Sequence, residues 1–179
     1  MKNLIKILLL SGVLWMSSSC QEQEMEQNQV LDDQSISANL RNYKAHLSAS
    51  EGVESKGQGQ AIFKFSKDGS ELYYKITVAN VESITMAHIH LRANEQTPNG
   101  PPVLWLIPDA PPPLSNPISA SGILVERTVT ESDLFGSLAG ASLEVLKGKI
   151  REGLTYVNVH TSAHPGGEIR GAIGPNTKK

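Results

Sequence analysis

Apolar and polar residues alternate with a period of two along several stretches of the chain, most clearly over 72–78. One face there carries Leu72, Tyr74, Ile76 and Val78, and the other carries Tyr73, Lys75 and Thr77. Successive side chains of a β-strand point to opposite faces, so this pattern predicts a half-buried antiparallel strand. The preceding Asp68-Gly69 pair is a strong hairpin signal, and we therefore predict a β-hairpin over 60–78.

Further strands are predicted between stretches rich in proline, glycine and asparagine. They are expected at 42–50, 84–91, 103–107, 118–129, 154–161 and 168–174, and the last two should form a closing hairpin. Neither face of 84–91 is plainly polar, which predicts a central strand. We expect loops at 94–102 and 108–117, because their prolines interrupt regular structure.

Two short helical segments are predicted between these strands. Thr130 followed by Asp133 resembles a capping box that opens a first turn. In 142–153, three apolar residues fall on one side and Gly153 is placed to end a helix; the three are Leu143, Leu146 and Ile150. Many short strands with little helix predict an all-β fold, an antiparallel β-sandwich or barrel with one or two short helices.

The first 20 residues have the layout of a targeting segment. Lys2 and Lys6 carry positive charge, 4–15 is mostly apolar, and Cys20 follows three serines. The apolar run is too short for a stable membrane-spanning helix. The layout resembles a bacterial lipoprotein signal, although Ser17 stands where an aliphatic residue is usual, and it implies cleavage before Cys20 and lipidation of that cysteine. The alternative is an ordinary signal peptide cleaved elsewhere.

This resemblance implies an extracytoplasmic protein that is lipid-anchored to a bacterial membrane, at the outer membrane or the cell surface. Because Cys20 is the only cysteine, the domain is expected to lack disulfides, thiolate nucleophiles and cysteine-ligated metals. Residues 21–38 are acidic and glutamine-rich, which predicts a flexible tether. One domain is then expected over 39–175. The net charge of −2, without a cluster of Lys and Arg, argues against a nucleic-acid partner.

Histidine is concentrated in two segments, MAHIHL at 86–91 and VNVHTSAHPGGEIRG at 157–171, which hold four of the five histidines. His88 and His90 share one face of a strand, with Cα atoms about 6.6 Å apart, so two imidazoles can converge on one ion. His160, and with less support His164, would supply further ligands. An imidazole-only site suits copper or zinc, and copper(II) binds such sites more tightly. The alternative is that these histidines are structural hydrogen-bonding residues.

The fifth histidine, His46, lies in the first predicted strand and is interpreted as a surface or rim residue. A metal-binding imidazole must be neutral. With ordinary histidines, copper binding should therefore weaken as the pH falls through about 6.5.

The two histidine segments resemble those of the CHRD domain, the module named after chordin. The matching features are the central His-Ile-His, Tyr-Val-Asn-Val-His-Thr at 156–161 and Pro-Gly-Gly-Glu-Ile-Arg-Gly at 165–171. His164 departs from the usual pattern, where an uncharged residue is expected. In chordin the domain belongs to an extracellular protein that binds growth factors, and bacterial members are mostly secreted or lipid-anchored. The resemblance therefore implies an extracytoplasmic module with a possible protein partner, and it carries no catalytic residue.

A looser resemblance is to copper–zinc superoxide dismutase, an antiparallel barrel with a copper-binding His-x-His strand and a later copper histidine. It implies a dismutase-like barrel as an alternative to an immunoglobulin-like sandwich. His88, His90 and His160 occur in the same order, but the bridging residues for zinc and the disulfide are missing. The comparison favours a single-ion site over a dismutase.

The closing segment carries other candidate residues. Glu168 and Arg170 lie two apart on a strand, so they either form an ion pair or, as we favour, fix the closing strand. Gly166 and Gly167 are expected to allow positive φ in the turn. Asn158 is expected to order the neighbouring loop through its side chain.

Three functions remain open from the sequence. The first is a non-catalytic, lipid-anchored extracytoplasmic module that binds copper or a similar ion. The second is a protein-interaction or adhesion module with structural histidines. The third is a redox enzyme at the same metal site, since one open coordination position separates a carrier from a catalyst.

Lipidation of Cys20 has a direct test. The wild-type protein should partition with membranes, and Cys20→Ser should lose that partitioning because it lacks the acylated thiol. Fractionation of cells that express each form measures the difference. A Cys20→Ser protein that remains wholly with the membranes would contradict lipidation.

Overall fold

The structure, a computed structural model, describes residues 41–107 and 113–176. The eight strands are β1 (Asn42–Ala49), β2 (Gln58–Phe65), β3 (Leu72–Leu91), β4 (Pro102–Ile107), β5 (Ile118–Val129), β6 (Thr155–Thr161), β7 (Ile169–Ala172) and β8 (Gly174–Pro175). The signal segment 1–20 with Cys20, the tether 21–38 and positions 108–112 of a predicted loop lie outside the described residues.

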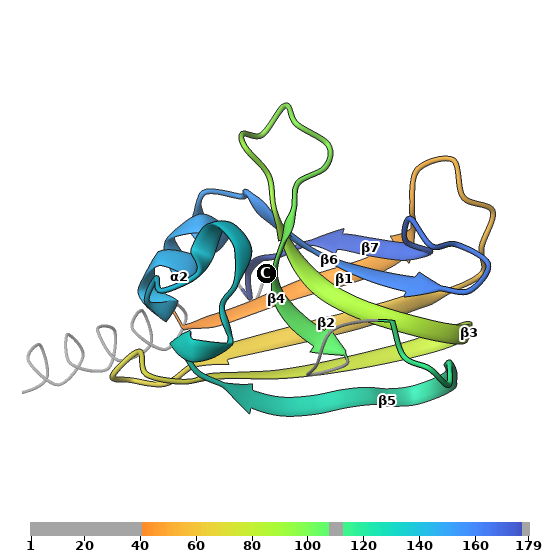
Figure 1. Ribbon diagram of the computed structural model, residues 1–179, viewed down its shortest axis with the longest axis horizontal. Helices are drawn as coiled ribbons and strands as arrows, with labels where there is room; N and C mark the ends of the chain where they lie inside the picture. Colours follow the sequence, from red (N-terminus) through yellow and green to blue (C-terminus); the bar gives the residue numbers. More distant parts are fainter. Residues whose placement is uncertain (1–40, 108–112, 177–179) are drawn as a thin grey trace, which may run out of the picture. The chain divides into compact units, whose positions relative to one another are not determined.

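Five strands close a barrel, so the prediction of an antiparallel all-β fold is confirmed in its barrel form. Around the sheet, β2, β1, β7, β6 and β3 follow one another, and β2 pairs again with β3. β4 and β5 extend the sheet as additional partners of β3, and β8 pairs with β1. Figure 1 shows β1, β2 and β3 side by side, with β6 and β7 continuing the wall.

β3 is one strand of 20 residues, whereas the sequence predicted separate strands ending at 78 and beginning at 84. Its first half pairs with β2 and β5, and its second half pairs with β6 and β4. Asn80 (φ 57°) and Ser83 (φ 52°) bend the strand between the halves. The prediction that 84–91 is a central strand is confirmed, because this half has a partner on each edge.

The bend also changes which side chains enter the barrel. Strict alternation along 84–91 would place Ile84 on the face of His88 and His90, but a register shift between Ile84 and Met86 interrupts it. Ile84 is therefore buried in the core together with Ala87 and Ile89, while the two histidines point to the other face of β3.

Alternating apolar residues from all walls of the barrel fill its interior. Besides the predicted face of β3, the core includes Tyr43, Ala45 and Leu47 of β1, Phe63 and Phe65 of β2, and Val157 and Val159 of β6. Complete burial of a large apolar side chain contributes about 1.5–3 kcal/mol to the free energy of folding. The core therefore stabilises the strands that carry the histidines.

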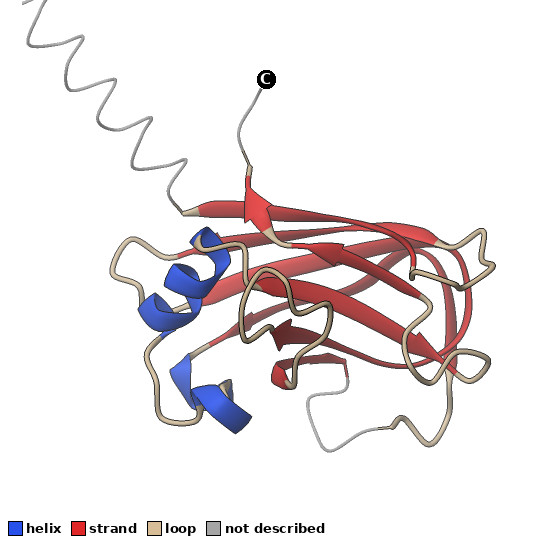
Figure 2. Ribbon diagram, turned by 90° about the horizontal axis from the view of Figure 1, so that it is seen from above, coloured by secondary structure: helices blue, strands red, loops and turns tan. Residues whose placement is uncertain are grey.

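The helical segments gather at one end of the strands (Figure 2). They are two 3-10 turns, Glu131–Asp133 and Gly136–Leu138, and helix α2 (Leu143–Arg151). The predicted capping box is present, since the Thr130 amide donates to Asp133 Oδ2 at 2.8 Å. α2 buries Leu143, Leu146 and Ile150, as predicted.

Gly171 of β7 lies against the backbone of β1, and its lack of a side chain is testable. A Cβ at this position would collide with the carbonyl oxygen of His46. Gly171→Ala should therefore lower the free energy of unfolding by about 1–3 kcal/mol, as overpacked sites do. Gly174→Ala is the matched control, because a Cβ there meets nothing within 4 Å. Urea unfolding compares the two, and equal stabilities would contradict the close approach.

Candidate metal centre

Three histidines from two strands lie together, as the sequence predicted. His88, His90 and His160 each offer a ring nitrogen, and these nitrogens all lie within 4.8 Å of one another. The exposed fractions of the three residues are 4%, 8% and 5%. Nitrogens that bind one ion at about 2.0–2.1 Å lie at most about 4 Å apart, so a small closure of the rings would let all three reach a single metal.

The register between β3 and β6 brings these residues together. His88 lies opposite Asn158, His90 lies opposite Tyr156, and His160 lies opposite Met86. Directly opposed residues share a face, so His160 is the diagonal neighbour of His88. The ring centroid of His88 is 4.4 Å from that of His90 and also 4.4 Å from that of His160.

Backbone carbonyl groups fix the tautomers of two of the rings. His90 Nδ1 lies 2.6 Å from the Gly100 carbonyl oxygen, and His160 Nδ1 lies 2.8 Å from the Pro165 carbonyl oxygen. A carbonyl oxygen only accepts, so Nδ1 is the protonated nitrogen of both neutral rings and Nε2 carries the lone pair. This is the orientation in which a metal-binding histidine is usually held.

The nitrogens left by this arrangement have no hydrogen-bond partner. Within the described part of the chain, His90 Nε2, His160 Nε2 and His88 Nδ1 are all buried without one. Leaving a buried polar atom unpaired costs about 1–3 kcal/mol. Three such atoms in one cluster mark a place where a partner from outside the protein, an ion or a water, would fit.

The loop between β3 and β4 presses its backbone against the site. Gly100 donates its amide to the Tyr156 hydroxyl at 3.3 Å and offers its carbonyl to His90. A side chain on Gly100 would collide with the backbone of Leu91. Only glycine lets the loop approach closely enough for this carbonyl to reach the ring.

Asn158 orders the turn after β6, which confirms its predicted role. Its Nδ2 donates to the Gly166 carbonyl oxygen at 3.2 Å, in the same turn that presents Pro165 to His160. Gly167 adopts φ 115° and packs directly on the Asn158 amide. Gly166 does not adopt a positive φ, so the expectation for the glycine pair is right only for Gly167.

Aromatic rings cover the cluster. The Tyr156 ring stacks on His90 with centroids 4.7 Å apart, and Trp105 meets His88 edge to face at 4.8 Å. Phe135 stacks in turn on Trp105 at 4.8 Å. Alternation along the strand puts Tyr156 on the face of His160, but no pattern in the sequence indicated a role for Trp105. Trp105 lies opposite His88 in the pairing of β3 with β4, and this pairing could not be predicted from the sequence.

Glu168 and Arg170 do not use each other as partners. Glu168 accepts hydrogen bonds from the hydroxyl groups of Ser55 at 2.6 Å and Thr161 at 2.8 Å. Arg170 donates to Asn99 Oδ1 and to the Pro98 carbonyl oxygen. The two residues thus hold loops to the closing strand, which agrees with the favoured interpretation.

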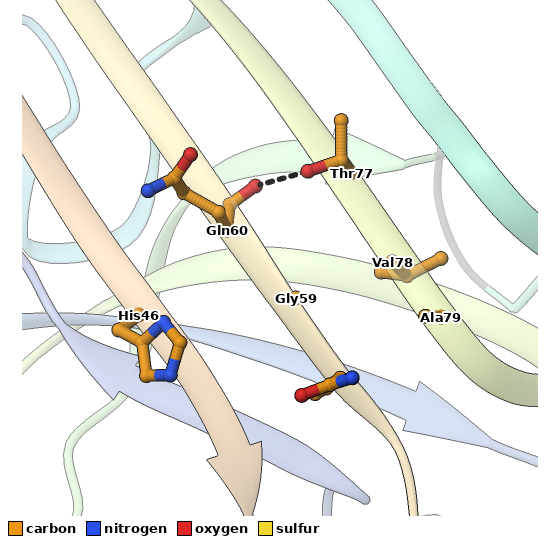
Figure 3. A pocket seen from close by; sticks show the side chains of 7 residues that line it. His46, Gly59, Gln60, Thr77, Val78 and Ala79 are labelled. Carbon is orange, nitrogen blue, oxygen red and sulfur yellow. Dashed lines mark hydrogen bonds between the residues drawn. The ribbon is translucent and has the colours of Figure 1, made fainter.

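The other two histidines lie outside this cluster. His164 uses its backbone in the turn, where its amide donates to Thr161 Oγ1 at 3.1 Å, and the converging group does not include it. His46 is exposed on β1, as predicted. It lines an open hollow of about 300 Å³ on the outer face of β1 to β3, together with Gln60 and Thr77 (Figure 3).

Burial keeps the three clustered rings neutral. Desolvation, followed by the neighbouring His90 and His160, lowers the pKa of His88 to about 3. Desolvation lowers the pKa of His90 to about 4, against the opposing effect of its hydrogen bond to Gly100, and it also lowers the pKa of His160. Competition between protons and a metal should therefore begin well below the pH of about 6.5 expected for ordinary histidines.

The family model of the CHRD domain matches residues 43–173, which include all three clustered histidines and both of their strands. The chain belongs to the CHRD-domain family. No curated protein matches this chain significantly. Among its described residues, this CHRD protein has no helix that is long and apolar enough to cross a bilayer.

The neutral buried rings predict a pH dependence of stability. Below about pH 6.5 these histidines are protonated in the unfolded chain but not in the folded chain. Each ring therefore lowers the free energy of unfolding by up to about 1.4 kcal/mol per pH unit. Above that pH these rings do not reduce the free energy of unfolding of the metal-free protein. Between pH 7 and pH 5 that free energy should fall. Urea unfolding at both pH values measures the fall. His160→Gln should reduce the fall and His46→Gln should not; identical pH dependence in all three proteins would contradict this.

Proposed function

We propose that this CHRD protein is a lipid-anchored extracytoplasmic module that binds one copper-like metal ion through His88, His90 and His160. The observation that carries the proposal is the convergence of three buried, unpartnered ring nitrogens. The Cys20 layout supports the anchor and the location.

The nitrogen pairing favours a metal over purely structural histidines. A buried structural histidine is expected to pair its ring nitrogens with the protein or with ordered water. Here the Nδ1 atoms of His90 and His160 bind carbonyl groups, while their Nε2 atoms are buried without a partner in the protein. A metal ion would accept all of these nitrogen lone pairs at once, and it would remove the cost of leaving them unpaired.

The donor set favours copper, with zinc next. All three ligands are neutral imidazoles, which suit both ions, and copper(II) binds nitrogen sites more tightly than other divalent first-row metals. The three protein ligands equal the number in catalytic zinc sites, whereas structural zinc sites use four. Three ligands are enough to hold an ion for storage or delivery.

Calorimetric titration of the purified protein with copper(II) tests the proposal. Wild type should bind one equivalent, and His90→Ala or His160→Ala should weaken binding by about 100-fold or more, since each removes a ligand. His46→Ala is the matched control, because it removes an exposed histidine from β1. Circular dichroism checks that each variant is folded. Absence of binding for copper in both oxidation states, or binding that His46→Ala weakens equally, would instead favour a protein-interaction module with structural histidines.

A further inference from the structure

We propose that the centre selects monovalent copper over divalent ions. This inference rests on the proposed function and concerns the charge that the site can hold. It follows from the donor set, the neighbouring guanidinium groups and the aromatic cover, each of which acts against a doubly charged ion.

The donor set contributes no negative charge. Within the residues that the structure describes, the converging group contains three histidines and no carboxylate or thiolate. The charge of the ion is then the charge of the whole centre. The energy needed to bury an ion grows with the square of its charge, so a dication is penalised about four times as heavily as a monocation in the same dry site.

The buried carboxylate nearest in sequence to His160 is already engaged. Glu168 is 8% exposed, and both of its oxygens accept hydroxyl hydrogen bonds, one from Ser55 and one from Thr161. Thr161 follows His160 directly on β6, so its side chain points to the opposite face of the strand. Glu168 therefore does not join the ligand set.

Two guanidinium groups lie one aromatic ring away from the histidines. The central carbons of Arg170 and Arg92 lie 4.1 Å and 4.9 Å from the centroid of the Tyr156 ring. That ring stacks on His90 with an interplanar angle of 8°. Repulsion between these cations and the bound ion is proportional to the charge of the ion, so it is twice as strong for copper(II) or zinc(II) as for copper(I).

The cover of the site limits additional ligands. Trp105 and Tyr156 pack on two of the rings, and none of the three histidines is more than 8% exposed. Zinc(II) requires a fourth ligand, and copper(II) likewise prefers more than three, whereas copper(I) is satisfied by three nitrogen donors. An apolar shell that restricts water therefore favours the lower oxidation state.

Competition titrations test this selectivity on the full-length protein. Copper(I) affinity is measured anaerobically against a chromogenic copper(I) chelator with ascorbate as the reductant, and copper(II) affinity is measured by calorimetry. We expect copper(I) to bind more tightly than copper(II), by about 1,000-fold, because both charge terms favour the monovalent ion. Arg170→Gln and Arg92→Gln should each reduce the ratio of copper(I) to copper(II) affinity by about tenfold. This change lowers the one-electron reduction potential of the bound copper by about 59 mV.

Two control variants separate charge from loop structure. Arg170→Lys keeps the charge but changes the hydrogen bonds to Asn99 and Pro98, so it should retain the wild-type ratio. Lys64→Gln removes an exposed cation from β2, which pairs only with β1 and the first half of β3, and it should leave the ratio unchanged.

Each outcome has a definite consequence. If copper(II) binds as tightly as copper(I), the selectivity is wrong while copper binding stands. If Arg170→Gln and Arg170→Lys narrow the ratio equally, or if Lys64→Gln narrows it as much, the charge argument is wrong. If neither ion of copper binds, the proposed function itself fails.

Discussion

The pairing of β3 with β6 is the contact on which both the barrel and the histidine cluster depend. It joins the second half of a 20-residue strand to the closing hairpin and places His160 diagonally across from His88. The same ladder sends Ala87, Ile89, Val157 and Val159 into the core. Because side chains alternate across both strands, burying the apolar face fixes the register, and that register positions the imidazoles on the opposite face.

Much of the fold could be predicted from local patterns. Alternation over 72–78, the Asp68-Gly69 turn and the Thr130 capping box all act within a few residues, and each is present. The continuity of β3 could not be predicted. The strand bends at Asn80 and Ser83, and it continues past the bend because residues on both sides pair with β5, which is distant in sequence. For the same reason the alternation failed at Ile84, where a shift in the ladder moves a side chain into the core.

Of the candidate site, only the three converging histidines could be predicted from the sequence. His-x-His on a strand and a late histidine indicated convergence, and His88, His90 and His160 do converge. Their environment depends on tertiary contacts. Trp105 and the Gly100 carbonyl reach the rings from β4 and from a loop, and burial then lowers the pKa values far below those of ordinary histidines. No spacing in the sequence specifies a desolvation energy, since it depends on what packs over the ring.

The use of backbone carbonyls to orient His90 and His160 affects how this domain can evolve. A side-chain acceptor is lost by a single substitution, whereas a carbonyl group is present whichever residue occupies the position. The two loops can therefore change most of their side chains while the proton stays on Nδ1 of each ring. The constraint falls on the shape of the loops, at Gly100 and in the Pro165 to Gly167 turn. The loop surfaces of this domain could thus change while its three imidazoles keep their orientation.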